Sequence, residues 1–228
     1  MSCLTQLSFV ANLFFVAIFL SIILQGRKWI KKLFFKYIID LRHQQRLSMF
    51  KASPMFKDAI VFVGDSITEG GNWSELFPNH HILNRGIGGD VSEGVLKRVD
   101  EIIRHRPIKI FICIGTNDLA KEVPQNTIIG NYKKIVKTLE MQLPQAKIYV
   151  QSVLPVGKNV IAGHDNKKIA LLNKEIEKLC KDKQLTYIDL YSNFTDSSGY
   201  LNPSYTNDKL HLMGEGYLLW KKLIEAYL

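Results

Sequence analysis

Residues 59–68, AIVFVGDSIT, decide the fold that this 228-residue chain can adopt. The run Ala59–Val63 is continuously apolar, as are strands buried on both faces of a parallel sheet. Gly-Asp-Ser follows it directly, so Ser66 is expected on the turn from this strand into a helix, where backbone N–H groups can meet a developing negative charge. A serine on such a turn can also simply cap the helix, which is the favoured interpretation of an isolated Gly-Asp-Ser.

The rest of the chain alternates between apolar runs and helical patterns. Further strands are predicted at 81–83, 109–114, 147–153 and 186–190, and helices at 72–77, 92–105, 125–142, 165–183 and 214–227. This alternation indicates an α/β protein with a parallel sheet covered on both faces. Five strands in this order predict a flavodoxin-like, three-layer α/β/α sandwich, in which sites form beyond the carboxyl ends of the strands.

Two more polar motifs follow predicted strands. The stretch NRGIGGD (84–90) has three glycines in four positions, which allow the close backbone approach by which the Gly89 N–H could enter a site. It does not fit the dinucleotide pattern G-x-G-x-x-G, because position 91 is Val. GTND (115–118) ends the third predicted strand, and the Asn117 amide can donate a hydrogen bond there. Taken alone, either motif is also explained by a tight turn or a cap.

The last motif is DKLH (208–211), near the end of the chain. A histidine acts as a base when a carboxylate holds its ring in the correct tautomer, and Asp208 and His211 are close enough to do this within one turn. Alone, this pair would be read as a surface aspartate and a structural histidine. The four motifs gain weight together, because every one of them is expected at the same end of the sheet. The G-x-S-x-G elbow of α/β-hydrolases is absent, since position 68 is Thr.

Together, these motifs resemble those of a known superfamily. The set GDSIT, Gly89, GTND and DKLH is similar to the SGNH (GDSL) hydrolases, and the closer resemblance, over about residues 58–228, is to their platelet-activating-factor acetylhydrolase-like branch. The stretches that carry the closer resemblance are NRGIGGD, IGTNDLA, LPQAKIYVQSVLPVGK and DKLHLMGEGY. One departure is Lys209, where relatives often carry Gly or an aromatic residue. This side chain is expected to border the mouth of the pocket.

The resemblance implies a role for each site residue. Ser66 would be the nucleophile, His211 the general base and Asp208 its partner. The backbone N–H groups of Ser66 and Gly89, with the Asn117 amide, would form the oxyanion hole. The resemblance implies no cofactor and no metal.

The expected activity is hydrolysis of a carboxylic ester through an acyl-serine intermediate, with a short acyl group such as acetyl on a lipid or a glycan. Two alternatives stay open. One is an O-acetyltransferase, in which a sugar hydroxyl replaces water. The other is a catalytically inactive binding domain, whose expected mark is a broken triad. The acyl length, the alcohol portion and the oligomeric state are left open by the sequence.

The N-terminal residues show a different pattern. Leu7 to Leu24 is almost wholly apolar, and no charged residue precedes Arg27. As a helix this run would be roughly 27 Å long, close to the thickness of a bilayer core. Residues 1–26 are therefore predicted to be an uncleaved transmembrane anchor, because a cleaved signal peptide normally begins with basic residues. A buried helix of a soluble domain is the alternative.

The net charge of +9 is concentrated beside this segment. Residues 27–51 hold eight basic residues and one acidic residue, whereas 52–228 hold 22 and 20. A local basic patch next to an apolar run is more typical of contact with anionic lipid than with nucleic acid. Residues 27–57 are predicted to be a basic juxtamembrane helix or linker, and 58–228 the hydrolase domain. The positive-inside rule then predicts a single-pass membrane protein with a cytoplasmic catalytic domain, and the opposite orientation is the alternative.

Overall fold

The computed structural model describes residues 25–26, 30, 33, 37–160 and 163–228. The chain divides into two compact units, Met1–Gln44 and Gln45–Leu228. In the first unit, residues 37–44 are helical. In the second, residues 45–52 are helical and the chain then enters the sheet. The expected domain boundary between residues 57 and 58 stays a prediction.

The second unit is built on a five-stranded parallel sheet with the order β2-β1-β3-β4-β5. The strands are β1 (Ile60–Gly64), β2 (Ile82–Gly86), β3 (Lys109–Cys113), β4 (Lys147–Gln151) and β5 (Thr186–Ile188). This is the predicted flavodoxin-like order, so the expected α/β architecture is confirmed. The order of strands reverses between β1 and β3, and the carboxyl ends of such strands are where sites form.

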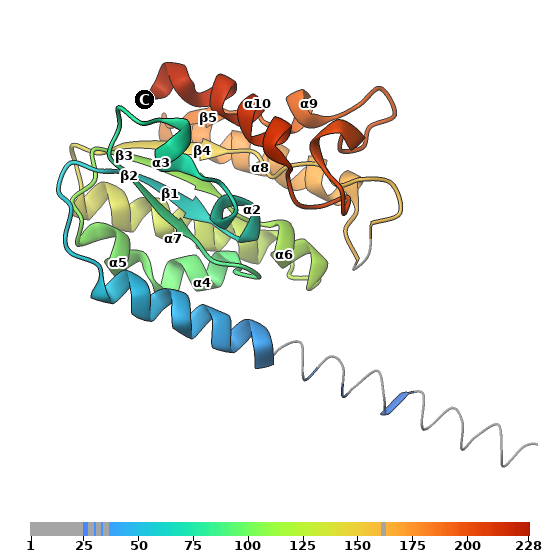
Figure 1. Cartoon of the computed structure of the whole chain (residues 1–228), viewed down its shortest axis with the longest axis horizontal. Helices are drawn as coiled ribbons and strands as arrows, with labels where there is room; N and C mark the ends of the chain where they lie inside the picture. The colour runs from blue at the N-terminus through green and yellow to red at the C-terminus, as the bar shows by residue number, and fades with distance from the viewer. Residues whose placement is uncertain (1–24, 27–29, 31–32, 34–36, 161–162) are drawn as a thin grey trace, which may run out of the picture. The chain divides into compact units, whose positions relative to one another are not determined.

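Helices cover both faces of this sheet (Figure 1). They are α2 (Ser66–Glu69), α3 (Trp73–Leu76), α4 (Ser92–Lys97), α5 (Val99–Ile103), α6 (Thr116–Ala120), α7 (Gln125–Gln142), α8 (Asn166–Lys183), α9 (Tyr191–Phe194) and α10 (Gly214–Ile224), with short 3₁₀ turns at Pro203–Tyr205 and Glu225–Tyr227. The single helix predicted at 92–105 is instead the pair α4 and α5. It breaks at Arg98, whose buried guanidinium pairs with Asp90 at 2.9 Å.

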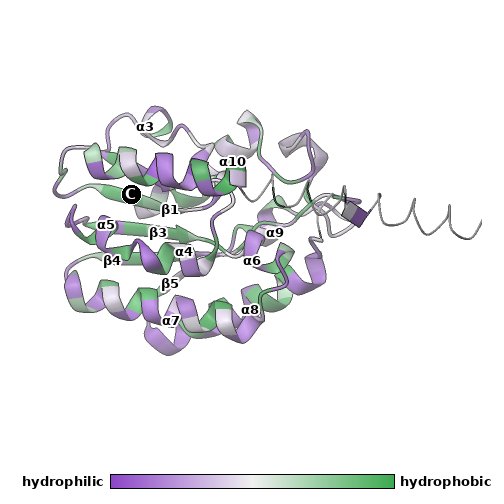
Figure 2. Ribbon diagram, turned by 90° about the horizontal axis from the view of Figure 1, so that it is seen from below, coloured by the Kyte–Doolittle hydropathy of each residue, from purple (hydrophilic) through white to green (hydrophobic). Residues whose placement is uncertain are grey.

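The strand residues alternate between the two faces, as the pleat requires. Val61 and Val63 belong to the core beneath α4, α5, α7 and α8. Ile60 and Phe62 belong to the core beneath α3 and α10, where Phe62 stacks on Trp73 with ring centroids 4.4 Å apart. The strands are mostly hydrophobic, while the helices alternate between hydrophobic and hydrophilic stretches (Figure 2). Trp220 packs on Trp73 and fixes α10 over the sheet.

The expected transmembrane helix needs correction. None of the helices in the described residues is both long enough and apolar enough to cross a bilayer. The helical residues 37–52 include Asp40, Arg42 and Arg46, and charges of this kind are costly to bury in hydrocarbon. The predicted span, Leu7 to Leu24, lies outside the described residues. We therefore withdraw the three expectations that depended on this helix, which are the single-pass membrane location, the contact with the membrane and the choice of membrane side.

Candidate active site

Ser66 is the first residue of α2 and is separated from the end of β1 only by Asp65. The helix is capped by Asp65, whose Oδ1 accepts a hydrogen bond of 2.9 Å from the Ile67 N–H. Because Asp65 is the cap, the Ser66 hydroxyl is not needed for capping. It lies 2.9 Å from Nε2 of His211.

A local turn brings Asp208 and His211 together. Oδ2 of Asp208 lies 2.6 Å from Nδ1 of His211, while Oδ1 accepts the backbone N–H groups of Leu210 and His211 at 2.9 and 2.7 Å. Lys209 takes a positive φ of 73° in this turn, a conformation that glycine adopts without strain. Burial raises the pKa of the Asp208 carboxyl, but its hydrogen bonds to His211 and to the two backbone N–H groups outweigh burial and lower this pKa to about 2. Asp208 is therefore a carboxylate at neutral pH.

The ionised Asp208 determines the tautomer of His211. A carboxylate only accepts hydrogen bonds, so the imidazole proton lies on Nδ1 and Nε2 presents a lone pair to the Ser66 hydroxyl. This arrangement of donor and acceptor is the one a serine nucleophile and its base require. We refer to Ser66, His211 and Asp208 as the Ser–His–Asp set.

The two other predicted donors lie on the neighbouring strand ends. Gly89 is in the turn after β2 and has a φ of +76°, which favours glycine. Asn117 is the second residue of α6, after β3. Its Nδ2 donates to the carbonyl of Asp90 at 3.0 Å, which ties the two donor segments together. The amide keeps a second N–H for another acceptor.

Two buried carboxyl groups, those of Asp65 and Asp90, lie near Ser66. Asp65 is almost fully buried, and burial raises the pKa of its carboxyl to about 7, with Asp90 adding to the rise and the bond from Ile67 opposing it. Asp90 itself is paired with Arg98. Asp65 therefore holds a proton over much of the range below neutrality, directly beside Ser66.

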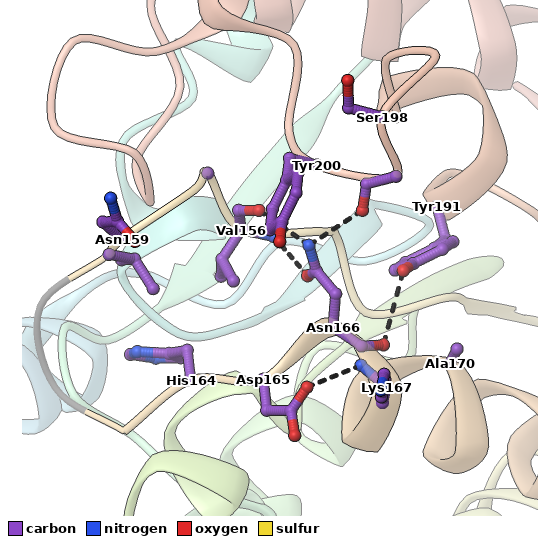
Figure 3. A pocket seen from close by; sticks show the side chains of 13 residues that line it. Val156, Asn159, His164, Asp165, Asn166, Lys167, Ala170, Tyr191, Ser198 and Tyr200 are labelled. Carbon is purple, nitrogen blue, oxygen red and sulfur yellow. Dashed lines mark hydrogen bonds between the residues drawn. The ribbon is translucent and has the colours of Figure 1, made fainter.

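A cavity of about 570 Å³ adjoins the site, lined by the loop after β4, the first turn of α8 and residues 198–200. Asn166 joins these segments through hydrogen bonds (Figure 3). The Ser–His–Asp set is not part of this lining. At the rim, the Gly157 N–H donates to the Lys209 carbonyl at 2.8 Å, so the loop after β4 supports the Asp208–His211 turn.

The titratable groups of the described residues are the candidates for a metal-ligand set. Within the described residues, no three His, Cys, Asp or Glu side chains are grouped so that they could hold a metal ion. His105, for example, is fully buried and lies 3.1 Å from Glu101.

One residue at the site was missed by sequence reasoning. Glu69 ends α2, and its Oε2 accepts a 2.6 Å hydrogen bond from the Gly88 N–H. Its spacing of three positions from Ser66 puts it on the same side of a short helix, but nothing in the sequence indicates its contact with Gly88.

The fold and this site define a class of protein. A parallel sheet that carries a hydrogen-bonded serine, histidine and aspartate at its carboxyl edge is an architecture of hydrolases that act on ester bonds. The sequence profile of the GDSL-like Lipase/Acylhydrolase family matches residues 62–219, well over half of the chain. The chain belongs to this family, and it is an ester-bond hydrolase.

Individual relatives agree with this assignment. Platelet-activating factor acetylhydrolase IB subunit alpha2 from Homo sapiens is 34% identical over 166 residues, covering 69% of this chain and 70% of the relative. The alpha1 subunit from Homo sapiens is 31% identical over 169 residues, with 69% and 70% covered. A solved structure from Streptococcus pneumoniae, named as a candidate platelet activating factor, has a TM-score of 0.79 and 29% identity, covering 85% of this chain and 96% of that chain. A GDSL-like lipase from Bacteroides thetaiotaomicron VPI-5482 has a TM-score of 0.72 and 26% identity, covering 81% and 96%.

Proposed function

We propose that the chain is a serine esterase that cleaves a short-chain carboxylic ester through an acyl-serine intermediate. The observation that carries this proposal is the 2.9 Å contact between the Ser66 hydroxyl and His211 Nε2, with Nδ1 of the same ring 2.6 Å from Asp208. A hydroxyl so placed can lose its proton to the ring as it attacks a carbonyl carbon.

The reaction follows from these contacts. Nε2 of His211 takes the Ser66 proton while Oγ bonds to the ester carbonyl carbon, and the resulting imidazolium faces the Asp208 carboxylate. The oxyanion receives hydrogen bonds from the N–H groups of Ser66 and Gly89 and from the Asn117 amide. The imidazolium then returns its proton to the departing alkoxide, leaving the acyl-serine and an alcohol. Water, activated by the same ring, releases the carboxylic acid.

The proposed substrate carries a short acyl group, such as acetyl, on a lipid or a glycan alcohol. Two observations support it. The relatives at 31–34% identity are named acetylhydrolases. In addition, the side chains of His211 and Asp208 are 45% and 48% exposed, so a bulky alcohol portion can extend into solvent.

The test is turnover of p-nitrophenyl acetate, butyrate and octanoate by the wild type and by Ser66→Ala. We expect the acetyl ester to be the best substrate and Ser66→Ala to lower kcat by at least about 10³-fold. A fluorophosphonate probe should label the wild type on Ser66 and leave the variant unlabelled. Full activity in Ser66→Ala would refute the proposal, and a preference for octanoate would refute its short-acyl part.

A further inference from the structure

The loop after β2 is anchored to the helix that begins at Ser66. The Gly88 N–H donates to Oε2 of Glu69 at 2.6 Å, and Gly88 immediately precedes Gly89. Because a hydrogen bond from an N–H to a carboxylate is stronger than one between neutral groups, this contact firmly fixes the Ile87–Gly88 peptide, which directly precedes the peptide that carries the Gly89 N–H.

Glu69 contributes a second contact through its backbone. Its carbonyl accepts a 3.0 Å hydrogen bond from Nδ2 of Asn84, whose Oδ1 accepts the Gly86 N–H at 2.9 Å. The Glu69 side chain is only 12% exposed. One residue therefore joins the segment that carries Ser66 both to the end of β2 and to the loop that carries Gly89.

Arg46 holds the Glu69 carboxylate from the outside. Its Nε lies 3.3 Å from Oε1 of Glu69, and its Nη2 donates to the Gly86 carbonyl at 3.2 Å. Its guanidinium lies over the Phe50 ring, 4.8 Å from the centroid, which fixes its direction. Arg46 lies in the helical residues 45–52, before the region that the family profile matches.

The side chains around Arg46 and Glu69 are not tightly packed, so packing alone does not hold these two residues in place. A cavity of about 340 Å³ lies against the pair and is lined in part by Arg46, Glu69 and Asn84. On its other side the loop is held by Lys121, whose Nζ donates to the Gly89 carbonyl at 3.0 Å. The Ile87 N–H donates to the Gly64 carbonyl and the Asp90 N–H to the Ile87 carbonyl, both at 3.1 Å, and between them the Glu69 carboxylate accepts the Gly88 N–H.

We propose that Glu69, oriented by Arg46, is a positioning residue that aims the Gly89 N–H at the oxyanion, an inference that rests on the proposed function. Without the carboxylate, the Ile87–Gly88 peptide loses this anchor, so the Gly88–Gly89 peptide that follows it can turn and the Gly89 N–H no longer meets the oxyanion. The ester ground state has little charge on this oxygen, so the loss falls on the transition state and lowers kcat more than it changes KM.

The experiment compares kcat and KM for p-nitrophenyl acetate, with kcat expressed per active site titrated by a fluorophosphonate. Glu69→Ala should lower kcat about 10- to 100-fold, since misplacing one oxyanion donor costs up to the value of that donor, and should change KM less than about threefold. The Ki of a trifluoromethyl ketone, which forms a tetrahedral oxyanion on the serine, should rise in parallel with the loss in kcat. Glu69→Gln keeps an oxygen acceptor for the Gly88 N–H and should recover much of the rate.

Arg46→Met keeps the aliphatic stem and removes the guanidinium. It should lower kcat about 3- to 10-fold, and the double variant with Glu69→Ala should be close to Glu69→Ala alone, because Arg46 acts through Glu69. If the double variant instead loses kcat by the product of the two single losses, the role of Arg46 is overturned. The matched control is Glu93→Ala, which breaks the exposed ion pair with Lys97 and should leave kcat unchanged.

The outcomes separate this inference from the proposed function. If Ser66→Ala keeps its activity, the proposed function fails whatever Glu69 does. If Ser66→Ala is inactive while Glu69→Ala keeps the wild-type kcat per titrated site and the wild-type Ki, the positioning role alone is overturned. A loss in the fraction of titratable sites, with unchanged turnover per site, would mark Glu69 as purely structural and would equally overturn it.

Discussion

The Tyr217 hydroxyl donates a 2.8 Å hydrogen bond to the carbonyl of Ile67. Tyr217 lies in α10, directly after the turn that holds His211, and Ile67 follows Ser66 in α2. This bond joins the two segments whose separation sets the distance from the serine hydroxyl to the imidazole.

Tyr217→Phe should lower both the free energy of unfolding and kcat. The change leaves the buried Ile67 carbonyl without this donor, which costs about 1–3 kcal/mol in the free energy of unfolding. We expect kcat to fall about threefold to tenfold as α10 shifts relative to α2. Urea denaturation and steady-state kinetics measure the two effects. Tyr205→Phe, which removes a hydroxyl from another half-buried tyrosine, is the control, and equal behaviour of the two variants would contradict the prediction.

Gly157→Ala should disturb the turn that carries His211. A Cβ at this position would lie 2.7 Å from Cβ and 3.1 Å from Cα of Lys209, so the turn must move. We expect kcat to fall roughly tenfold, the scale of a small misplacement of a base. Lys209→Gly removes the nearer atom and should restore much of the rate in the double variant. Gly130→Ala on α7, where nothing lies within 4 Å, is the control.

Asp65→Asn should change how stability depends on pH. Burial raises the pKa of this carboxyl from 3.8 to about 7, so between these values the native state binds more protons than the unfolded state. The free energy of unfolding therefore falls as pH rises from about 4 to 7, by up to about 4 kcal/mol, and is then constant. Asparagine can also cap α2, so the variant should keep the fold and lose this slope.

Chemical denaturation at pH 5 and at pH 8 measures the difference. The exposed Asp100→Asn on α5 serves as the comparison and should retain the wild-type slope. An Asp65→Asn variant that still loses stability across this range, as the wild type does, would show that another group is responsible.

Asp208→Asn should abolish most of the turnover while leaving the protein folded. An amide at this position can donate to Nδ1 of His211, which favours the tautomer with its proton on Nε2, and this tautomer cannot accept the Ser66 proton. We expect kcat to fall about 10³- to 10⁴-fold at neutral pH. Asp182→Asn, on the exposed side of α8, controls for the loss of a charge. Turnover within tenfold of the wild type would rule out this role for Asp208.

The sequence predicts the sheet and the main site contacts because both have local signals. Ala59–Val63 is apolar without interruption, and the motifs of Ser66 and Asn117 follow strands that pair side by side. The two helices at 92–103 could not be separated, because the helical period continues through Arg98 while its side chain turns inward to a charge. The transmembrane helix was inferred from composition at Leu7 to Leu24, and the described residues lend it no support.

The contacts of Glu69 were out of reach for a different reason. Its bond to Gly88 depends on a side-chain direction and a loop conformation, neither of which leaves a pattern in the sequence. Arg46 is further removed, since it approaches Gly86 from 40 positions away along the chain. Contacts of this kind follow from tertiary structure, so they become visible only with coordinates.

The position of Arg46 also bears on how the enzyme should be prepared for study. Residues 45–52 would look dispensable to anyone trimming the chain to its family match at 62–219. Such a fragment contains all three members of the Ser–His–Asp set, but it lacks the Arg46 guanidinium that holds Glu69, and it also lacks the first two residues of β1 and the buried Trp220 of α10. A low kcat measured on that fragment would reflect the removed residues and not the activity of the full chain.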